Sequence, residues 1–237
     1  MSAVYLLTLR QLSGRWRLLI MTLLAAMPVL IAVLMLRSDN APSVGEFETA
    51  VLSAMLAGAI APLVVLAIGT VAFGNEVEDR TLANLTLSPM PRWQIVLPKL
   101  LGTISVAAPF IAASAFATAY VAFLGDATAV LAVTAAAIVV VALYSAAFVW
   151  LGLVNTQAIG IGLVYIVLWE GFLSQYISGV RLLSIRHYAI ALMHAMDERR
   201  FADASHLSAG LALTISAALF AGFLLLSVRR LRRMDVP

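Results

Sequence analysis

Runs of about twenty apolar residues recur along this chain of 237 residues, and they constrain its fold more than any other feature. A helix of roughly 20 residues crosses the ~30 Å hydrocarbon core of a bilayer, so each run has the length of a membrane span. Hydrophobic residues make up 63% of the chain and charged residues only 11%, whereas a soluble domain is about half apolar. The sequence therefore predicts an all-α integral membrane protein.

Six spans are expected in a single transmembrane domain that covers residues 1–237. They are Leu18–Leu36, Val51–Phe73, Leu100–Leu124, Ala127–Leu153, Ala158–Leu173 and Leu207–Val228. An uncleaved first span is expected instead of a signal peptide, because its apolar run is long and no small-residue cleavage site follows it. Residues 3–17 combine apolar side chains with arginines, which predicts an interfacial helix with a break at Gly14.

Lysine and arginine counts predict the orientation, because cytoplasmic loops carry the excess of basic residues. With the N-terminus inside, the inner segments hold ten of the 15 basic residues: Arg10, Arg15, Arg17, Arg80, Arg92, Lys99, Arg229, Arg230, Arg232 and Arg233. The outer segments hold the other five, with seven of the 12 acidic residues. Both termini are therefore expected in the cytoplasm, with the chain in the inner (plasma) membrane. Topology and anionic membrane lipid account for the basic surplus, so no nucleic-acid partner is expected.

A polar segment, residues 74–99, separates the second and third expected spans. It carries three acidic and three basic residues in a chain with few charges. In its middle, Leu82, Leu85 and a turn at Leu87–Pro89 lie on one side of a short amphipathic helix. A segment too polar to cross a bilayer, with one apolar face, is expected to lie against a partner protein at the membrane surface.

The chain lacks the residues for several kinds of chemistry. Its single lysine, Lys99, lies between Pro98 and Leu100, whereas a phosphate-binding loop needs glycines followed by Lys-Ser or Lys-Thr. There is no cysteine for a disulfide, a thiolate metal site or a nucleophile. No serine elbow or paired intramembrane aspartates are found. The chain is therefore not expected to be an enzyme or to hold a cofactor, and any ATPase must be a separate chain.

Glu170 is the ionisable residue that lies well within an apolar run, residues 163–176. A carboxylate in lipid is costly, so Glu170 is expected to face the bundle interior, a water-filled vestibule or a neighbouring helix. Two hypotheses stay open. Glu170 belongs to a substrate path or outer gate, or it is an interfacial carboxylate that binds backbone where the helix breaks before Gly171.

Residues 174–205 hold two apolar pieces too short to span, Val180–Leu183 and Tyr188–Met196. Such pieces beside a full span predict re-entrant or interfacial helices, here an extracellular cap on the bundle. His187 and His194 are seven residues apart and can share a helical face. A metal site there needs Asp197 or Glu198 as a further ligand, and is the weaker alternative to histidines in a polar pocket.

These features together resemble the permease subunits of type-2 ABC transporters. The shared architecture is six spans, an N-terminal interfacial helix, a charged loop between spans two and three, and a broken helical hairpin before span six. The loop follows the family's pattern of an acidic residue, Gly-Thr-Leu, a leucine pair, a Ser-Pro turn, an arginine and a lysine. The matching residues are Glu76, Arg80-Thr81-Leu82, Leu85, Leu87-Ser88-Pro89, Arg92 and Lys99, with Arg80 departing from the family's glycine.

The resemblance implies that residues 74–99 form a coupling helix in a cleft of a partner ABC ATPase. It also implies a permease dimer, with a second copy or a sister chain, bound to two ATPase copies that hold ATP and Mg. The expected coupling residues are Glu76, Glu78, Arg80, Leu82, Leu85, Leu87, Pro89 and Arg92. The resemblance further implies export by alternating access at the dimer interface. The alternatives are a haem-exporter-like membrane subunit of cytochrome c maturation, a passive channel or scaffold, and an intramembrane enzyme.

Overall fold

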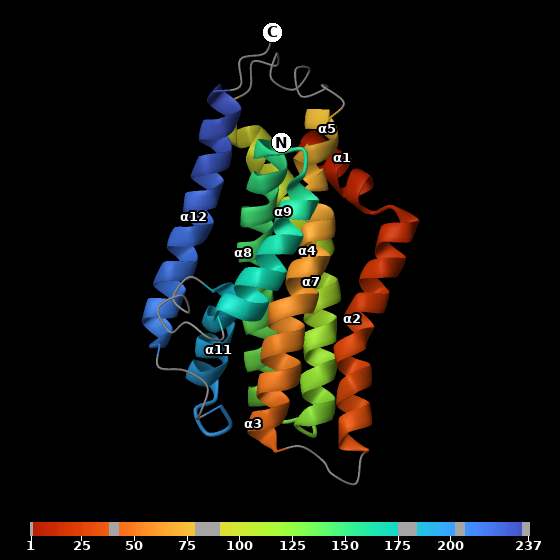
Figure 1. Ribbon diagram of the computed structural model, residues 1–237, viewed down its shortest axis with the longest axis vertical. Helices are drawn as coiled ribbons and strands as arrows, with labels where there is room; N and C mark the ends of the chain where they lie inside the picture. The colour runs from red at the N-terminus through yellow and green to blue at the C-terminus, as the bar shows by residue number, and fades with distance from the viewer. Residues whose placement is uncertain (1, 38–42, 79–90, 175–183, 202–206, 234–237) are drawn as a thin grey trace.

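The computed structural model describes residues 2–37, 43–78, 91–174, 184–201 and 207–233. Throughout these ranges the regular structure is helical, with no strand. The helices form one elongated bundle, and the N-terminal helix and the C-terminal end of the last helix lie at the same end of it (Figure 1). We call this end the terminal end and the opposite one the distal end. The all-α prediction is confirmed.

The described part of the chain contains both α-helices and two π-helical segments. In chain order they are α1 (Ser2–Leu12), α2 (Arg15–Leu36), α3 (Val44–Phe47), η1 (Glu48–Ile60), α4 (Ala61–Gly69), α5 (Val71–Glu78), α7 (Trp93–Ala122), α8 (Ala127–Val154), α9 (Ala158–Val164), η2 (Tyr165–Leu173), α11 (Ile185–Met196) and α12 (Ala209–Arg233). The π-helical segments are η1 and η2. From α3 to α5 the chain is one long helical segment.

Five of these helical segments are long and apolar enough to cross a membrane. They are Arg15–Leu36, Val44–Glu78, Trp93–Ala122, Ala127–Val154 and Gly210–Arg233. The expected span Ala158–Leu173 is instead a shorter apolar helix, formed by the 7 residues of α9 and the 9 of η2. At 1.5 Å per residue it reaches roughly 24 Å, less than the ~30 Å hydrocarbon core. The five long helices indicate a multi-pass membrane protein.

Helix α8 forms the centre of the bundle. It packs against α7, α11, α12, α4 and α5, and alanines fill much of its buried surface. Near its C-terminal end, a Cβ added at Gly152 would lie 2.2 Å from the carbonyl oxygen of Thr70, between α4 and α5. Small residues let helix backbones approach closely in a membrane protein, and Gly152 does so here.

The separate short helix expected before the first span is present as α1. Its break from α2 lies at Ser13 and Gly14. The hydroxyl of Tyr5 donates to the Ser105 hydroxyl oxygen at 2.9 Å, so α1 lies on α7. Its position at a membrane interface stays a prediction.

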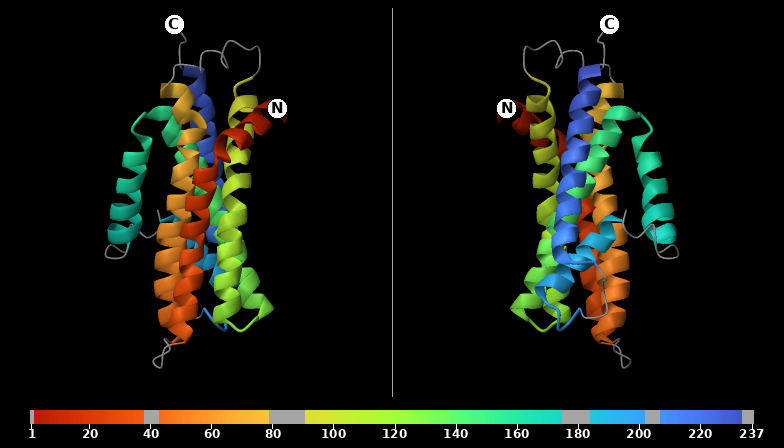
Figure 2. Two further views of the ribbon diagram at one scale, coloured as in Figure 1. Left: turned by 90° about the vertical axis from the view of Figure 1, so that its right-hand side faces the viewer. Right: turned by 90° about the vertical axis from the view of Figure 1, so that its left-hand side faces the viewer.

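In place of the fifth predicted span, two shorter helical pieces, α9–η2 and α11, complete the bundle, and we call them the broken crossing. Figure 2 shows α9 and η2 on an outer side, running from the terminal end part-way along the bundle. Helix α11 lies nearer the distal end and packs against α8, α12 and η1. The segment expected to form a cap, residues 174–205, thus contributes a helix that lies along the bundle beside its central helix.

Candidate functional site

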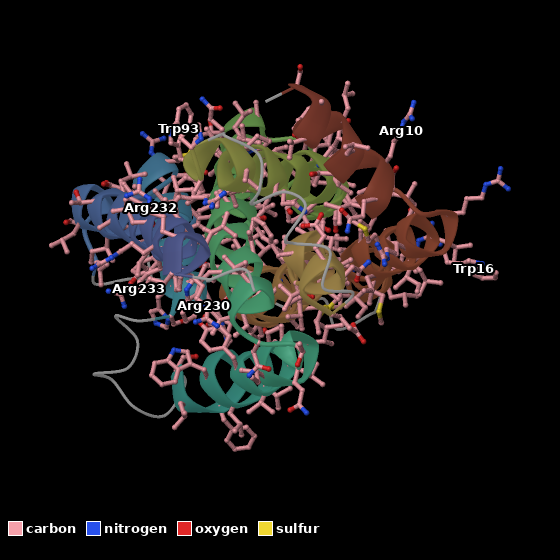
Figure 3. All side chains as sticks on the ribbon, turned by 90° about the horizontal axis from the view of Figure 1, so that it is seen from above. Arg10, Trp16, Trp93, Arg230, Arg232 and Arg233 are labelled. Atoms are coloured by element: carbon pink, nitrogen blue, oxygen red, sulfur yellow. The ribbon has the colours of Figure 1, made fainter. Side chains whose placement is uncertain are left out.

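Basic side chains gather at the terminal end of the bundle (Figure 3). Arg10 lies on α1, and Arg230, Arg232 and Arg233 lie in the last turn of α12. At the distal end the charges are mixed. Arg200 forms an ion pair there with Asp126, and its guanidinium group lies over the ring of Phe123. A basic end and a mixed end match the distribution from which the orientation was predicted.

A buried ion pair joins α5 to α7 at the terminal end. The ammonium nitrogen of Lys99 lies 2.6 Å from Glu76 Oε1, and it also donates to the carbonyl oxygen of Ala72. The same nitrogen lies 4.6 Å from the ring centre of Phe73, a cation–π distance. Lys99 is 2% exposed and Glu76 is 20% exposed. A buried ammonium is tolerated only when it is paired, so these contacts hold the two helices together.

This ion pair bears on the coupling role that the sequence suggests for Glu76. Its Oε1 binds Lys99, and its Oε2 is buried with no hydrogen-bond partner among the described residues. Glu76 therefore holds α5, which precedes residues 79–90, against α7, which follows them. A contact between Glu76 and a partner protein stays a prediction.

Of the other predicted coupling residues, two lie at the ends of these helices that face residues 79–90, and the rest belong to residues 79–90. Glu78 is exposed at the end of α5. Arg92 is half-buried just before α7 and has an interaction partner within the chain. The remaining ones lie outside the described residues: Arg80, Leu82, Leu85, Leu87 and Pro89.

Glu170 lies where η2 meets the start of α11. Its side chain is 0% exposed. Its Oε1 accepts hydrogen bonds from the backbone N–H of Ile185 at 3.0 Å and from the Tyr165 hydroxyl at 3.2 Å. Its Oε2 accepts the Ser184 hydroxyl at 2.5 Å. Because Ile185 is the first residue of α11, the carboxylate caps that helix, whose positive end favours a negative charge.

Arg186 extends this arrangement to η1. Its Nε donates to the Ser53 hydroxyl oxygen at 2.6 Å, and the side chain is 7% exposed. Gly58 leaves room for it, since an added Cβ there would lie 3.3 Å from Arg186 Cδ. We call Glu170, Ser184, Ile185, Arg186, Tyr165 and Ser53 the polar joint.

Both π-helical segments contribute a polar residue to this joint, Ser53 from η1 and Glu170 from η2. Such segments are rare and are frequent at functional sites. Sequence reasoning found Glu170 but missed Ser53, Ser184 and Arg186. The available signal was the presence of Ser184 and Arg186 between the two apolar pieces of residues 174–205.

The structure corrects one of the two hypotheses for Glu170. The helix does not break before Gly171, because η2 continues to Leu173 and the Ser174 hydroxyl donates to the Glu170 carbonyl oxygen at 2.9 Å. The carboxylate binds the beginning of the next helix instead. A role in a substrate path or outer gate stays a prediction.

The two histidines that we considered as metal ligands, His187 and His194, both lie on α11. His194 Nδ1 is 2.8 Å from the carbonyl oxygen of Phe201. Within the described ranges, no three metal-ligating side chains come together.

No protein-family model and no curated protein matches the chain. The likeness to type-2 permeases thus depends on the residues of the polar segment and on the order of the helices.

Proposed function

We propose that the chain is the membrane-spanning permease subunit of an ATP-driven exporter of the type-2 ABC class. It forms a dimer with a second copy or a sister chain, and two separate ATPase subunits bind ATP and Mg. Five long apolar helices support this function, as does a polar segment between the second and third of them.

The observation that carries the proposal is the Lys99–Glu76 pair at the base of the polar segment. A loop that only connects two spans has no need of a buried ion pair between them. A coupling segment has that need, because it must transmit displacement to both spans at once. The pair joins the last turns of Val44–Glu78 to the first turns of Trp93–Ala122, so the two helices respond together.

In the proposed cycle, ATP closes the two ATPase subunits and moves the coupling segment held between them. The displacement passes into α5 and α7, which Lys99 and Glu76 hold together. Since α5 continues into α4 and η1, the same movement reaches Ser53 and its partner Arg186 in the polar joint. The broken crossing therefore moves with the second span, and access changes at the dimer interface.

The test is co-expression with the ABC ATPase that the proposal requires, sought first in the reading frames next to the gene for this chain, followed by affinity purification through a tag on this chain. Leu82→Asp with Leu85→Asp removes the apolar face of the polar segment and leaves Lys99 and Glu76 unchanged. The ATPase recovered with this variant is expected to fall at least about tenfold, equivalent to ~1.4 kcal/mol of binding free energy.

The matched control is Leu82→Ile with Leu85→Met, which keeps the face apolar and is expected to retain the ATPase. Equal recovery with the aspartate variant would contradict docking by this face. A wild-type chain that transports without any ATPase would overturn the proposed function.

A further inference from the structure

A chamber of about 380 Å³ is lined by residues of α8, α9, η2, α11 and α12. Its volume falls in the range of small-molecule sites, ~300–1,000 Å³. Such sites are mostly apolar and aromatic with few polar groups. The chamber has this character, and nothing in the proposed coupling mechanism uses it.

Two aromatic pairs from different helices line the chamber. On η2, the rings of Tyr165 and Trp169 are stacked, with centroids 6.4 Å apart and planes 16° apart. From α8 and α12, the rings of Trp150 and Phe223 lie 5.7 Å apart at 47°. Ring faces and edges attract other flat rings through their quadrupoles, so these walls favour an aromatic ligand over a saturated chain.

Among the described residues that line the chamber, none has a charged side chain, and the one hydroxyl, on Tyr165, already donates to Glu170 at 3.2 Å. An ion transferred into such a place would lose its hydration without gaining a partner of opposite charge. The chamber therefore selects a neutral molecule.

The chamber also borders the polar joint. Ile185 and Tyr165 line it, and the backbone N–H of the first and the hydroxyl of the second both bind Glu170 Oε1. A ligand in the chamber would contact the residues that hold the carboxylate at the start of α11.

We propose that this chamber is a binding site for a neutral molecule with a flat aromatic ring system. The site does not depend on an ATPase partner and is present in the single chain.

The probe for the test is N-phenyl-1-naphthylamine, a neutral aromatic fluorophore that accepts energy from tryptophan. It is titrated into the purified full chain in nanodiscs, and probe emission is recorded on tryptophan excitation. Probe dissolved in lipid gives a linear background, whereas occupancy beside Trp150 and Trp169 gives a saturable component. A saturable component of about one probe per chain is expected.

Ala147→Phe fills the chamber from α8 and is expected to weaken the saturable component at least about tenfold. Ala217→Phe adds the same ring to an exposed position of α12 and is the matched control, expected to bind as wild type. Leu219→Trp fills the chamber from α12 and serves as the second variant if Ala147→Phe does not fold.

A purely linear signal in the wild-type chain would mean that the probe only dissolves in lipid, and would overturn the site. A saturable signal that Ala147→Phe and Leu219→Trp leave unchanged would place the binding elsewhere and overturn it equally.

Discussion

Two carboxylates hold neighbouring helices together by different means. Glu76 binds an ammonium group across 2.6 Å, whereas Glu170 binds two hydroxyls and a backbone N–H. In a bundle made mostly of alanine, valine and leucine, these contacts determine which helices pack together and how they are positioned relative to one another along the bundle axis. Apolar packing alone specifies such positions less sharply.

Lys99→Met is expected to destabilise the chain, because Glu76 then keeps a partly buried charge without its partner. Removing one member of a buried pair costs ~3–5 kcal/mol, and the 20% exposure of Glu76 favours the lower end. Adding Glu76→Gln should restore part of the loss, with a coupling free energy of ~0.5–3 kcal/mol. A double-mutant cycle on unfolding in detergent measures this energy, and strictly additive effects would contradict the pairing.

Glu170→Ala is expected to loosen the first turn of α11, because Ile185 and Ser184 lose their acceptor. An unsatisfied buried donor costs ~1–3 kcal/mol. Glu170→Gln should be milder, since its amide oxygen can still accept from Ile185. Leu168→Ala, at an exposed position of the same segment, is the control.

Hydrogen exchange at Ile185 and in the rest of the first turn measures the effect of these Glu170 variants. Exchange that stays at the wild-type rate in Glu170→Ala would show that the carboxylate does not stabilise this helix end.

The sequence shows which single residues are unusual but does not show their partners. Glu170 is conspicuous because a carboxylate is costly among apolar residues. Two of its partners, Ser184 and Ile185, lie 14 and 15 residues further along the chain, and Lys99 lies 23 residues from Glu76. Contacts across such separations depend on how the helices pack, which hydropathy does not encode.

Among the elements, hydropathy predicts the long helices well and the broken crossing poorly. The expected span Ala127–Leu153 corresponds closely to α8, which ends at Val154. The expected span Ala158–Leu173 is apolar apart from Glu170, yet it is too short to cross alone. Composition shows how apolar a segment is, but the continuity of a helix also depends on its local backbone hydrogen bonds. The π-helical segments leave no periodic pattern of apolar residues in the sequence that would predict them.

Gly152→Ala is expected to lower the unfolding temperature, although alanine is the better helix former by ~1 kcal/mol. The added Cβ would lie 2.2 Å from the Thr70 carbonyl oxygen, so α8 must move away from the α4–α5 junction. Gly160→Ala, on α9, has nothing within 4 Å of the new Cβ and should be neutral or stabilising. Thermal unfolding of the two variants compares them, and equal midpoints would contradict the close approach of these helices.

Across the whole molecule, α1, the C-terminal end of α12 and the facing ends of α5 and α7 lie at the terminal end, where the arginines gather (Figures 1 and 3). The sequence predicted this shared end from the number of spans and the positions of the charges. The function is harder to predict than the fold, since the proposed function requires an ATPase that is a separate chain.

The proposed function requires the terminal end to face the cytoplasm. The chain has no cysteine, so single cysteines can be placed without background. Glu78→Cys marks the terminal end and Glu198→Cys the distal end, both at exposed glutamates. With a membrane-impermeant maleimide on intact cells, Glu198→Cys is expected to be labelled at once and Glu78→Cys only after permeabilisation. Labelling of Glu78→Cys in intact cells would put the polar segment outside, beyond the reach of any ATPase, and would contradict the account.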